Sequence, residues 1–190
     1  MRNIYFVGYR ASGKTTLAKA LAEQFGHSFV DTDELFVKAQ GSEIADYVKA
    51  KGWESFRTAE TEVLKNISQR EGMIVSCGGG IVLSHENRHI LKNGFVIYLQ
   101  VDARTIIERL EQDPLESQRP SLTGKGLLEE VQDILVEREP LYNVSADVVL
   151  DGTLPVDVLA GCLAVAIGDS LLGAEPKKTC STGCQCGVNG

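Results

Sequence analysis

The chain has 190 residues, a length that predicts one domain able to bury roughly 70% of its unfolded surface. Its composition, 43% hydrophobic and 24% charged residues, is that of an ordinary globular protein. A net charge of −7 argues against a nucleic-acid partner, because contact with many phosphates needs a basic face. The longest apolar stretch, 158–167, is too short to span a bilayer, and the N-terminus lacks the apolar segment of a secretory signal. We therefore expect a cytoplasmic protein without a membrane partner.

The predicted elements begin with an apolar strand, Ile4–Val7, that leads into a phosphate-binding motif. Residues 8–15 read GYRASGKT and match G-x-x-x-x-G-K-[ST] where a strand turns into a helix. Glycines let backbone N–H groups and the start of the helix close around phosphate oxygens. Lys14 would then reach the β- and γ-phosphates, and the Thr15 hydroxyl would ligate Mg²⁺. The motif predicts a nucleotide site.

The residues after this motif predict a helix over Lys14–Phe25. Apolar side chains recur every fourth residue, at Leu17, Leu21 and Phe25, and Gly26 stands where a helix C-cap belongs. An accidental Gly-rich turn is the alternative interpretation of the motif, and these flanking signals disfavour it.

The second predicted strand, 28–30, is followed by Asp31-Thr32-Asp33. Ligands of open α/β sheets bind at the carboxyl edge of the strands, which is where this tripeptide falls. One carboxylate could hold Mg²⁺ through water while the other accepts a hydrogen bond from a hydroxyl, as a general base does. The alternative is that Thr32 or Asp33 merely caps the next helix.

Residues of about 33–60 form a helical excursion that is longer than one crossover needs. Within it, a helix with one apolar face is expected from about 54 to 67. Arg57 and Glu60 lie three residues apart on this helix, so Glu60 can hold the guanidinium in place. A plain surface ion pair is the alternative.

The third predicted strand, Met73–Ser76, is followed closely by Gly78-Gly79-Gly80. A tight turn alone would explain three glycines. The alternative is that they allow backbone amides to approach a ligand closely.

The fourth predicted strand, 95–99, precedes a helix that begins near Asp102, a suitable N-cap. The polar segment 111–125 follows and contains Arg119. It is either a surface loop or a closing lid. We favour the lid, because phosphoryl transfer needs water excluded and positive charge added as the site closes.

The last predicted elements are a helix over 127–139, a strand over 147–150 and a helix after Pro155. The first of these helices is expected to stop before Pro140, with Arg138 at its end, where the helix dipole alone would favour a cation. Strands that alternate with helices predict an α/β protein, with a parallel sheet covered on both faces. Two aspartates, two arginines and bare backbone at one edge would suit a polyhydroxylated carboxylic acid.

Five cysteines form an odd set without the spacing of a disulfide framework, which favours a reducing compartment. Cys77 and Cys162 lie in apolar segments and are expected in the core. The other three, Cys180, Cys184 and Cys186, fall in 173–190. We expect this stretch to be a disordered, dispensable tail on a single domain of 1–172; opportunistic metal binding or thiol chemistry is the alternative.

Over residues of about 3–165, these motifs resemble those of the shikimate kinases in the same order. The motifs are the P-loop, Asp31-Thr32-Asp33, Phe56-Arg57-x-x-Glu60, Cys77-Gly78-Gly79-Gly80, Arg119-Pro120-x-Leu122-Thr123-Gly124 and Glu137-Arg138-x-x-Leu141-Tyr142. The Leu-Thr-Gly-Lys wording of the lid is similar to that of the second isoenzyme type.

The resemblance implies a P-loop fold like that of the nucleoside monophosphate kinases, with a five-stranded parallel sheet in the order 2-3-1-4-5 and a monomeric state. It implies transfer of the ATP γ-phosphate to the 3-hydroxyl of shikimate, with Mg²⁺, on the route to chorismate and the aromatic amino acids.

The resemblance also implies roles at the nucleotide end of the site. Thr15 would ligate Mg²⁺ and Asp31 would hold it through water, while Lys14 and Arg119 would act on the phosphates as catalytic residues. The nucleotide would contact Ala11, Ser12, Gly13, Lys14, Thr15, Thr16 and Arg119, with Arg109 and Pro155 beside the adenine.

At the shikimate end, the resemblance makes Asp33 a ligand of the ring hydroxyls and the candidate catalytic base. Arg57 and Arg138 would clamp the carboxylate. Gly78, Gly79 and Gly80 would add backbone contacts.

Two P-loop positions depart from the family. Ala11 stands where Gly is frequent, and alanine adopts a positive φ only at a cost. Arg10 stands where Met is frequent. Two other functions stay open: a gluconate kinase on the same scaffold, and a P-loop module that binds nucleotide as a switch without turnover. The glycine run with paired Arg57 and Arg138 favours shikimate.

Overall fold

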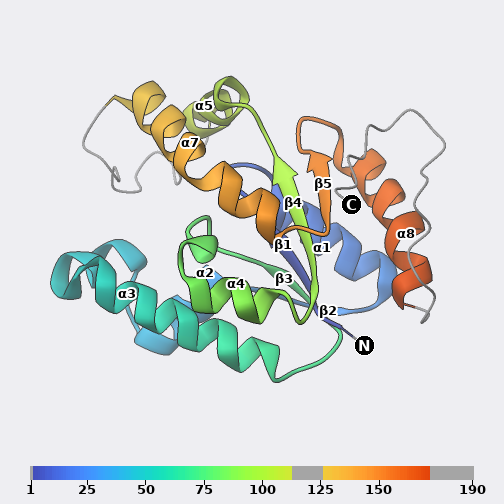
Figure 1. The fold of residues 1–190 in the computed structure, drawn as a ribbon, viewed down its shortest axis with the longest axis horizontal. Coiled ribbons are helices and arrows are strands. Elements are labelled where there is room, and N and C mark those ends of the chain that lie inside the picture. The colour runs from blue at the N-terminus through green and yellow to red at the C-terminus, as the bar shows by residue number, and fades with distance from the viewer. Residues whose placement is uncertain (1, 113–125, 172–190) are drawn as a thin grey trace.

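Five parallel strands form one sheet in the order β2-β3-β1-β4-β5 in a computed structural model that describes residues 2–112 and 126–171 (Figure 1). The strands are β1 (Ile4–Val7), β2 (Ser28–Asp31), β3 (Met73–Ser76), β4 (Phe95–Gln100) and β5 (Val148–Asp151). The helices of the described residues are α1 (Lys14–Phe25), α2 (Thr32–Gln40), α3 (Ile44–Ser68), the 3₁₀ turn η1 (Ile81–Leu83), α4 (His85–Leu91), α5 (Ala103–Gln112), α7 (Leu127–Ser145) and α8 (Val156–Leu171). The strand order is the one that the family resemblance implied, and the alternation of strand and helix agrees with the prediction from the sequence pattern.

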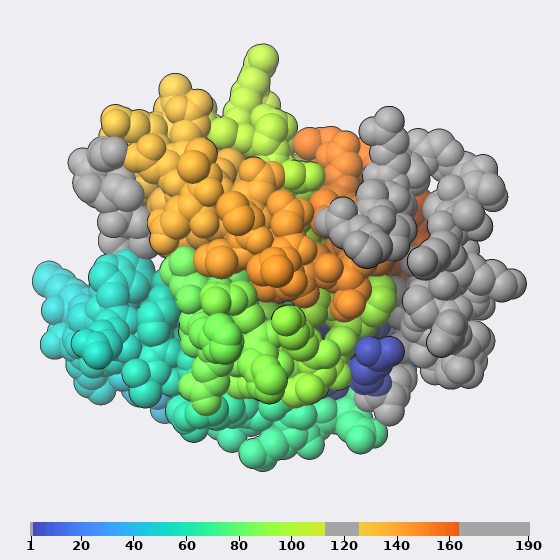
Figure 2. All heavy atoms as spheres, in the orientation of Figure 1, coloured from blue at the N-terminus to red at the C-terminus, as the bar shows by residue number. Residues whose placement is uncertain are grey.

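Side chains of the central strand β1 alternate between two apolar cores. Tyr5 and Val7 pack with residues of α3, α4 and α7, whereas Ile4 and Phe6 pack with residues of α1 and α8. Helices therefore cover both faces of the sheet, as the apolar runs predicted. In Figure 2 the spheres of α7, α4 and α3 follow one another from top to bottom over the middle of the visible face, and only a small blue patch of the N-terminal segment shows.

The two edge strands differ from the prediction that every strand is buried on both faces. β2 and β5 each keep partly exposed residues, because a strand at the edge of a sheet has a neighbour on one side only. The predicted boundaries of these strands and of β4 differ from the observed ones by one residue at one end or at both.

The helical excursion after β2 consists of α2 and α3. The rings of Phe36, Tyr47 and Phe56 join the two helices through edge-to-face contacts, with centroids 5.0 and 4.9 Å apart. α3 is longer than the predicted helix of 54–67, but Gly52 interrupts it with φ 83° and ψ 166°. The segment beyond Gly52 corresponds to the predicted helix.

The prediction that a helix stops before Pro140 is wrong. α7 continues through Pro140 to Ser145, so Arg138 lies in the helix interior. Proline has no N–H to donate to the carbonyl oxygen of Val136, and loss of this helical hydrogen bond costs about 3 kcal/mol. Val136 is 76% exposed, so water can hydrogen-bond to that carbonyl instead. Beyond the proline, Tyr142 is buried and stacks on Tyr98 with centroids 4.9 Å apart. Burial of this ring offsets the missing hydrogen bond.

Two predictions about helix ends are confirmed. Asp102 caps α5, with its Oδ1 accepting from the Thr105 N–H at 3.0 Å, and Gly26 ends α1 in the left-handed region. Cys77 is buried as expected, whereas Cys162 is only half-buried. Within the part of the chain that the structure describes, no helix combines the length and apolar character needed to cross a membrane.

Two predicted segments lie outside the described residues. Arg119 and most of the predicted lid fall in 113–125, and the three cysteines of the predicted tail fall in 172–190. Their predicted roles remain predictions.

Candidate active site

The P-loop runs from the end of β1 to the start of α1, and two of its glycines are required by its shape. Gly8 has φ 144°, and a Cβ there would stand 2.7 Å from the carbonyl oxygen of Leu99 in β4. Gly13 has φ 95° and precedes the first residue of α1. The loop can therefore turn closely around a ligand at the helix N-terminus, where backbone N–H groups favour an anion.

Ala11 adopts a left-handed conformation with φ 57°, although alanine resists it. This conformation costs about 1–2 kcal/mol. Arg109 of α5 opposes the strain by donating to the carbonyl oxygens of Ala11 at 3.3 Å and Ser12 at 3.1 Å. Arg109 also donates to the Gly152 carbonyl at 2.8 Å, which ties the loop to the turn after β5.

Lys14 folds over the P-loop. Its ammonium group donates to the Tyr9 carbonyl oxygen at 2.7 Å and to the Ser12 hydroxyl at 3.4 Å, and the residue is 7% exposed. A compact cation is thus held against the loop whose backbone would surround phosphate oxygens.

A pocket of about 430 Å³ opens beside the P-loop. Its lining includes all six P-loop and α1 residues predicted to contact the nucleotide, Ala11 through Thr16, together with Arg109. Pro155 lies between two other lining residues, Leu154 and Val156. The volume falls in the range usual for small-molecule and cofactor sites.

Three polar side chains meet where α1 faces the ends of β2 and β3. The Thr15 hydroxyl lies 3.0 Å from Oδ2 of Asp31 and 3.0 Å from the hydroxyl of Ser76. Asp31 and Ser76 are paired in register on neighbouring strands, which explains why they meet. The other oxygen of Asp31 caps α2 by accepting from the Asp33 N–H at 2.9 Å. The capping residue is therefore Asp31, not Thr32 or Asp33.

This cluster fits a magnesium ion bound together with a nucleotide. Mg²⁺ in such sites takes one or two protein oxygens, phosphate oxygens and waters, so a full protein cage is not needed. Thr15 and Asp31 supply one hydroxyl and one carboxylate oxygen in contact with each other. Among residues 2–112 and 126–171, no group of three His, Cys, Asp or Glu side chains is suited to a metal.

The glycine turn after β3, formed by Gly78, Gly79 and Gly80, leaves room for two charged side chains. A Cβ at Gly78 would stand 2.5 Å from Oδ1 of Asp33, and one at Gly80 would clash with the guanidinium of Arg57. The Gly78 N–H donates to the Thr32 hydroxyl at 2.8 Å. Asp33 and Arg57 thus lie directly against the turn.

Arg57 is held from several sides. Its Nη1 lies 2.8 Å from both carboxylate oxygens of Glu60, as the spacing predicted, and Glu60 is 4% exposed. The guanidinium carbon lies 5.5 Å from the centroid of the Trp53 ring and 4.9 Å from that of Phe56, within range of cation–π attraction. Burial raises the pKa of Glu60 above its ordinary value, while the positive charge of Arg57 opposes that rise.

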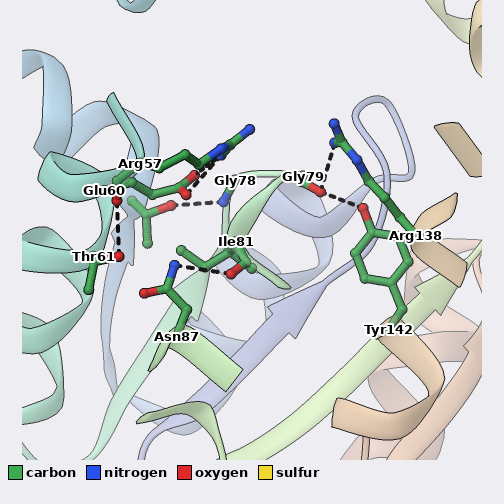
Figure 3. Close-up of polar contacts among 10 residues, drawn as sticks. Arg57, Glu60, Thr61, Gly78, Gly79, Ile81, Asn87, Arg138 and Tyr142 are labelled. Atoms are coloured by element: carbon green, nitrogen blue, oxygen red, sulfur yellow. Dashed lines mark hydrogen bonds and ion pairs between the residues drawn. The ribbon is translucent and has the colours of Figure 1, made fainter. Parts of the chain in front are cut away.

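The second arginine approaches the glycine turn from α7. Arg138 Nη1 donates to the Gly79 carbonyl oxygen at 3.2 Å, and the Tyr142 hydroxyl donates to the same oxygen at 2.5 Å. Burial raises the pKa of Tyr142 to about 12, so its hydroxyl remains a donor. Figure 3 shows the guanidinium ends of Arg57 and Arg138 on the same side of the turn. Two such groups can bind one carboxylate.

The structure gives four residues roles in the site that the sequence did not predict. Ser76 completes the cluster with Thr15, Thr32 anchors Gly78, Trp53 packs on Arg57 and Tyr142 holds Gly79. The position of Ser76 at a strand end was a usable signal. The partners of Trp53 and Tyr142 depend on packing between elements, which no local pattern encodes.

A family model described as shikimate kinase matches residues 10–162 of the chain. Shikimate kinase 2 of Yersinia enterocolitica is 45% identical over 155 residues, which are 81% of this chain and 88% of that protein. This relative agrees with the isoenzyme type that the lid wording resembles.

Two solved structures share the fold. Shikimate kinase from Acinetobacter baumannii, solved in complex with shikimate, is 30% identical with a TM-score of 0.80, and the match covers 91% of this chain and 94% of that one. Shikimate kinase from Aquifex aeolicus is 28% identical with a TM-score of 0.73, over 90% and 99% of the two chains. With its P-loop, paired arginines and glycine turn in this arrangement, the chain belongs to the shikimate kinase family.

Proposed function

We propose that the chain transfers the γ-phosphoryl group of ATP to the 3-hydroxyl of shikimate, which yields shikimate 3-phosphate and ADP for the synthesis of chorismate and the aromatic amino acids. The observation that carries the proposal is the position of Asp33, Arg57 and Arg138 around one glycine turn that also contacts the P-loop. Membership of the shikimate kinase family supports it.

At the nucleotide end, the P-loop would bind the triphosphate of ATP. Backbone N–H groups at the start of α1 and the Lys14 ammonium would stabilise charge on its oxygens. Thr15, and Asp31 through water, would hold Mg²⁺, which when bound neutralises charge on the β- and γ-phosphates. Arg109 would keep the strained loop in place next to the adenine pocket, and Pro155 would flank that pocket.

At the acceptor end, Arg57 and Arg138 would bind the carboxylate of shikimate and so orient its ring. Asp33 would accept a hydrogen bond from the 3-hydroxyl and take its proton as the oxygen attacks the γ-phosphorus in line with the leaving ADP oxygen. Gly78, Gly79 and Gly80 would let the substrate approach the backbone. Arg119 would add positive charge over the phosphates from the predicted lid.

We further propose that the chain acts as a cytoplasmic monomer with one domain of 1–172. The described side chains assigned to the two ends of the site meet within one chain, which supports a monomer. The net charge of −7 argues against a nucleic-acid partner.

The test is the release of ADP from Mg-ATP by the purified chain, with shikimate, gluconate or a nucleoside monophosphate as acceptor. We expect release with shikimate alone. Release with gluconate or a monophosphate instead would keep the P-loop assignment and overturn the assignment of the acceptor pocket. ATP binding without release for any acceptor would favour a nucleotide-dependent switch.

A further inference from the structure

α7 contacts the P-loop near one end and the glycine turn near the other. In its first turn, Oε1 of Glu130 lies 3.1 Å from Nη2 of Arg10 in the P-loop. About two and three helical turns later, respectively, Arg138 and Tyr142 donate to the carbonyl oxygen of Gly79. The helix therefore joins the loop that would bind phosphate to the turn that would bind shikimate.

The glycine turn also contacts the P-loop directly. A Cβ at Gly79 would stand 3.3 Å from the backbone nitrogen of Arg10 and 3.5 Å from the carbonyl oxygen of Gly8. The contacts thus close a ring that runs from Arg10 through Glu130 and α7 to Gly79 and back to Arg10. In a closed ring, a shift of one member displaces the next, so the ion pair restrains Arg138 at the far side.

The ion pair within this ring is buried. Glu130 is 1% exposed, and the Arg10 side chain is 14% exposed. Nε of Arg10 and Nε of Arg138 are buried with no hydrogen-bond partner in the part of the chain that the structure describes. Buried pairs add little net stability, because desolvation offsets their attraction. A charged hydrogen bond does fix distance and direction, which is the property the ring uses.

We propose that Arg10 and Glu130 are positioning residues, which hold the P-loop and α7 in register so that Arg138 is oriented for the substrate carboxylate before shikimate binds. The inference rests on the proposed function, because it concerns the carboxylate of shikimate. Without the pair, α7 can move against the P-loop, so the ligand that binds first, nucleotide or shikimate, loses binding free energy in fixing their arrangement. The ligand that binds second loses less, because the arrangement is already fixed.

Calorimetric titration of Glu130→Gln with shikimate, with and without saturating Mg-ADP, tests this inference. Glutamine keeps the shape of the side chain but leaves the Arg10 charge uncompensated. We expect the shikimate dissociation constant to rise about tenfold without nucleotide and by less than about threefold with Mg-ADP bound. The control is Glu137→Gln, which makes the same charge change at an exposed residue of α7 and is expected to leave both constants unchanged.

A double-mutant cycle adds a second readout. Because the pair acts as a unit, the double variant Arg10→Gln with Glu130→Gln is expected to lose no more shikimate affinity than one single variant does. The relevant single variant is the one that binds shikimate less tightly. Losses that add would overturn the inference, and so would a shikimate affinity of Glu130→Gln within about twofold of the wild type in both conditions.

Folding and function are kept apart in this design. If Glu130→Gln does not fold, the variant Arg10→Met with Glu130→Leu replaces the buried charges by apolar side chains, and the same dependence on Mg-ADP is expected of it. Wild-type shikimate affinity in that variant would overturn the inference. A wild-type chain that does not bind shikimate would contradict the proposed function instead.

Discussion

Asp33 and Arg57 reach the candidate site because the residues beside them lack side chains. The Asp33 carboxylate occupies the place of a Cβ at Gly78, and the Arg57 guanidinium that of a Cβ at Gly80. Neither glycine has a left-handed φ, so their conformation alone does not require glycine. The glycine turn and the two charged side chains therefore form one unit, in which a larger residue would displace a functional group.

We expect Asp33→Asn to lower kcat by about 10²–10⁴-fold, because the amide cannot take the proton of the 3-hydroxyl. The affinity for Mg-ADP is expected to stay unchanged, since Asp33 lies at the glycine turn and not among the residues that line the nucleotide pocket. Steady-state kinetics and calorimetry measure the two quantities. Asp46→Asn, an exposed change in the first turn of α3, serves as the control. Near-normal turnover of Asp33→Asn would show that Asp33 is not the base in the mechanism.

Arg57→Ala and Arg138→Ala are each expected to weaken shikimate binding by about 2–4 kcal/mol, because each leaves the substrate carboxylate short of a charged partner in a desolvated site. Isothermal calorimetry measures the change. Arg104→Ala is a matched control, since that side chain is 88% exposed and forms an ion pair with Glu108 of the same helix. Unchanged shikimate affinity in both site variants would refute the carboxylate clamp.

At the scale of elements, the strands were predictable and the last part of α7 was not. Short apolar runs bounded by turn signals located every strand to within one residue at either end. This worked because strands of a parallel sheet covered on both faces are apolar along their length. The end of α7 depends on Tyr142, which stacks on Tyr98 of β4 and binds Gly79 after β3. Local rules for proline ended the helix too early, because they contain no information about that tertiary contact.

α7 should become more stable when its proline is replaced. In Pro140→Ala the alanine N–H can bond to the Val136 carbonyl, which is worth up to about 3 kcal/mol in a helix interior. Loss of the proline's restraint on the unfolded chain offsets about 1 kcal/mol of this gain. We therefore expect the free energy of unfolding in urea to rise by about 1–2 kcal/mol.

Val136→Ala is the control for this prediction, since it changes an exposed side chain in the same turn without adding a backbone donor. It should alter the free energy of unfolding by no more than about 0.5 kcal/mol. An equal or lower stability of Pro140→Ala would contradict this prediction and would mean that the proline itself supports the contacts of Tyr142.

At the scale of the whole molecule, the site is assembled by contacts between residues far apart in the sequence. Arg109 bonds to Gly152 across 43 positions, Tyr142 to Gly79 across 63 and Arg10 to Glu130 across 120. The sequence could indicate which groups gather at the carboxyl edge, because parallel strands end on the same side. It could not indicate which pairs touch, since that depends on how the helices pack across the sheet.

The packing of α8 and the extent of the family match bear on the extent of the domain. Leu159, Ala160 and Leu163 of α8 pack against the same core as Leu17 and Leu21 of α1. The family match ends at residue 162, close to the last of these core residues. Residues 173–190 therefore follow the family match, which supports the proposal of one domain of 1–172.

Removal of 173–190 should leave kcat and the KM for shikimate within about twofold of the values for the full chain. The free energy of unfolding should stay within about 0.5 kcal/mol of that of the full chain. A chain that stops at Leu154 should fail to fold, because the loss of α8 exposes the apolar face of α1 and the sheet. Kinetics and urea unfolding of the three chains distinguish the outcomes. If removal of 173–190 lowers kcat at unchanged stability, the cysteine-containing segment takes part in turnover. If it lowers stability, the domain extends beyond 172, and the cysteines belong to the folded unit.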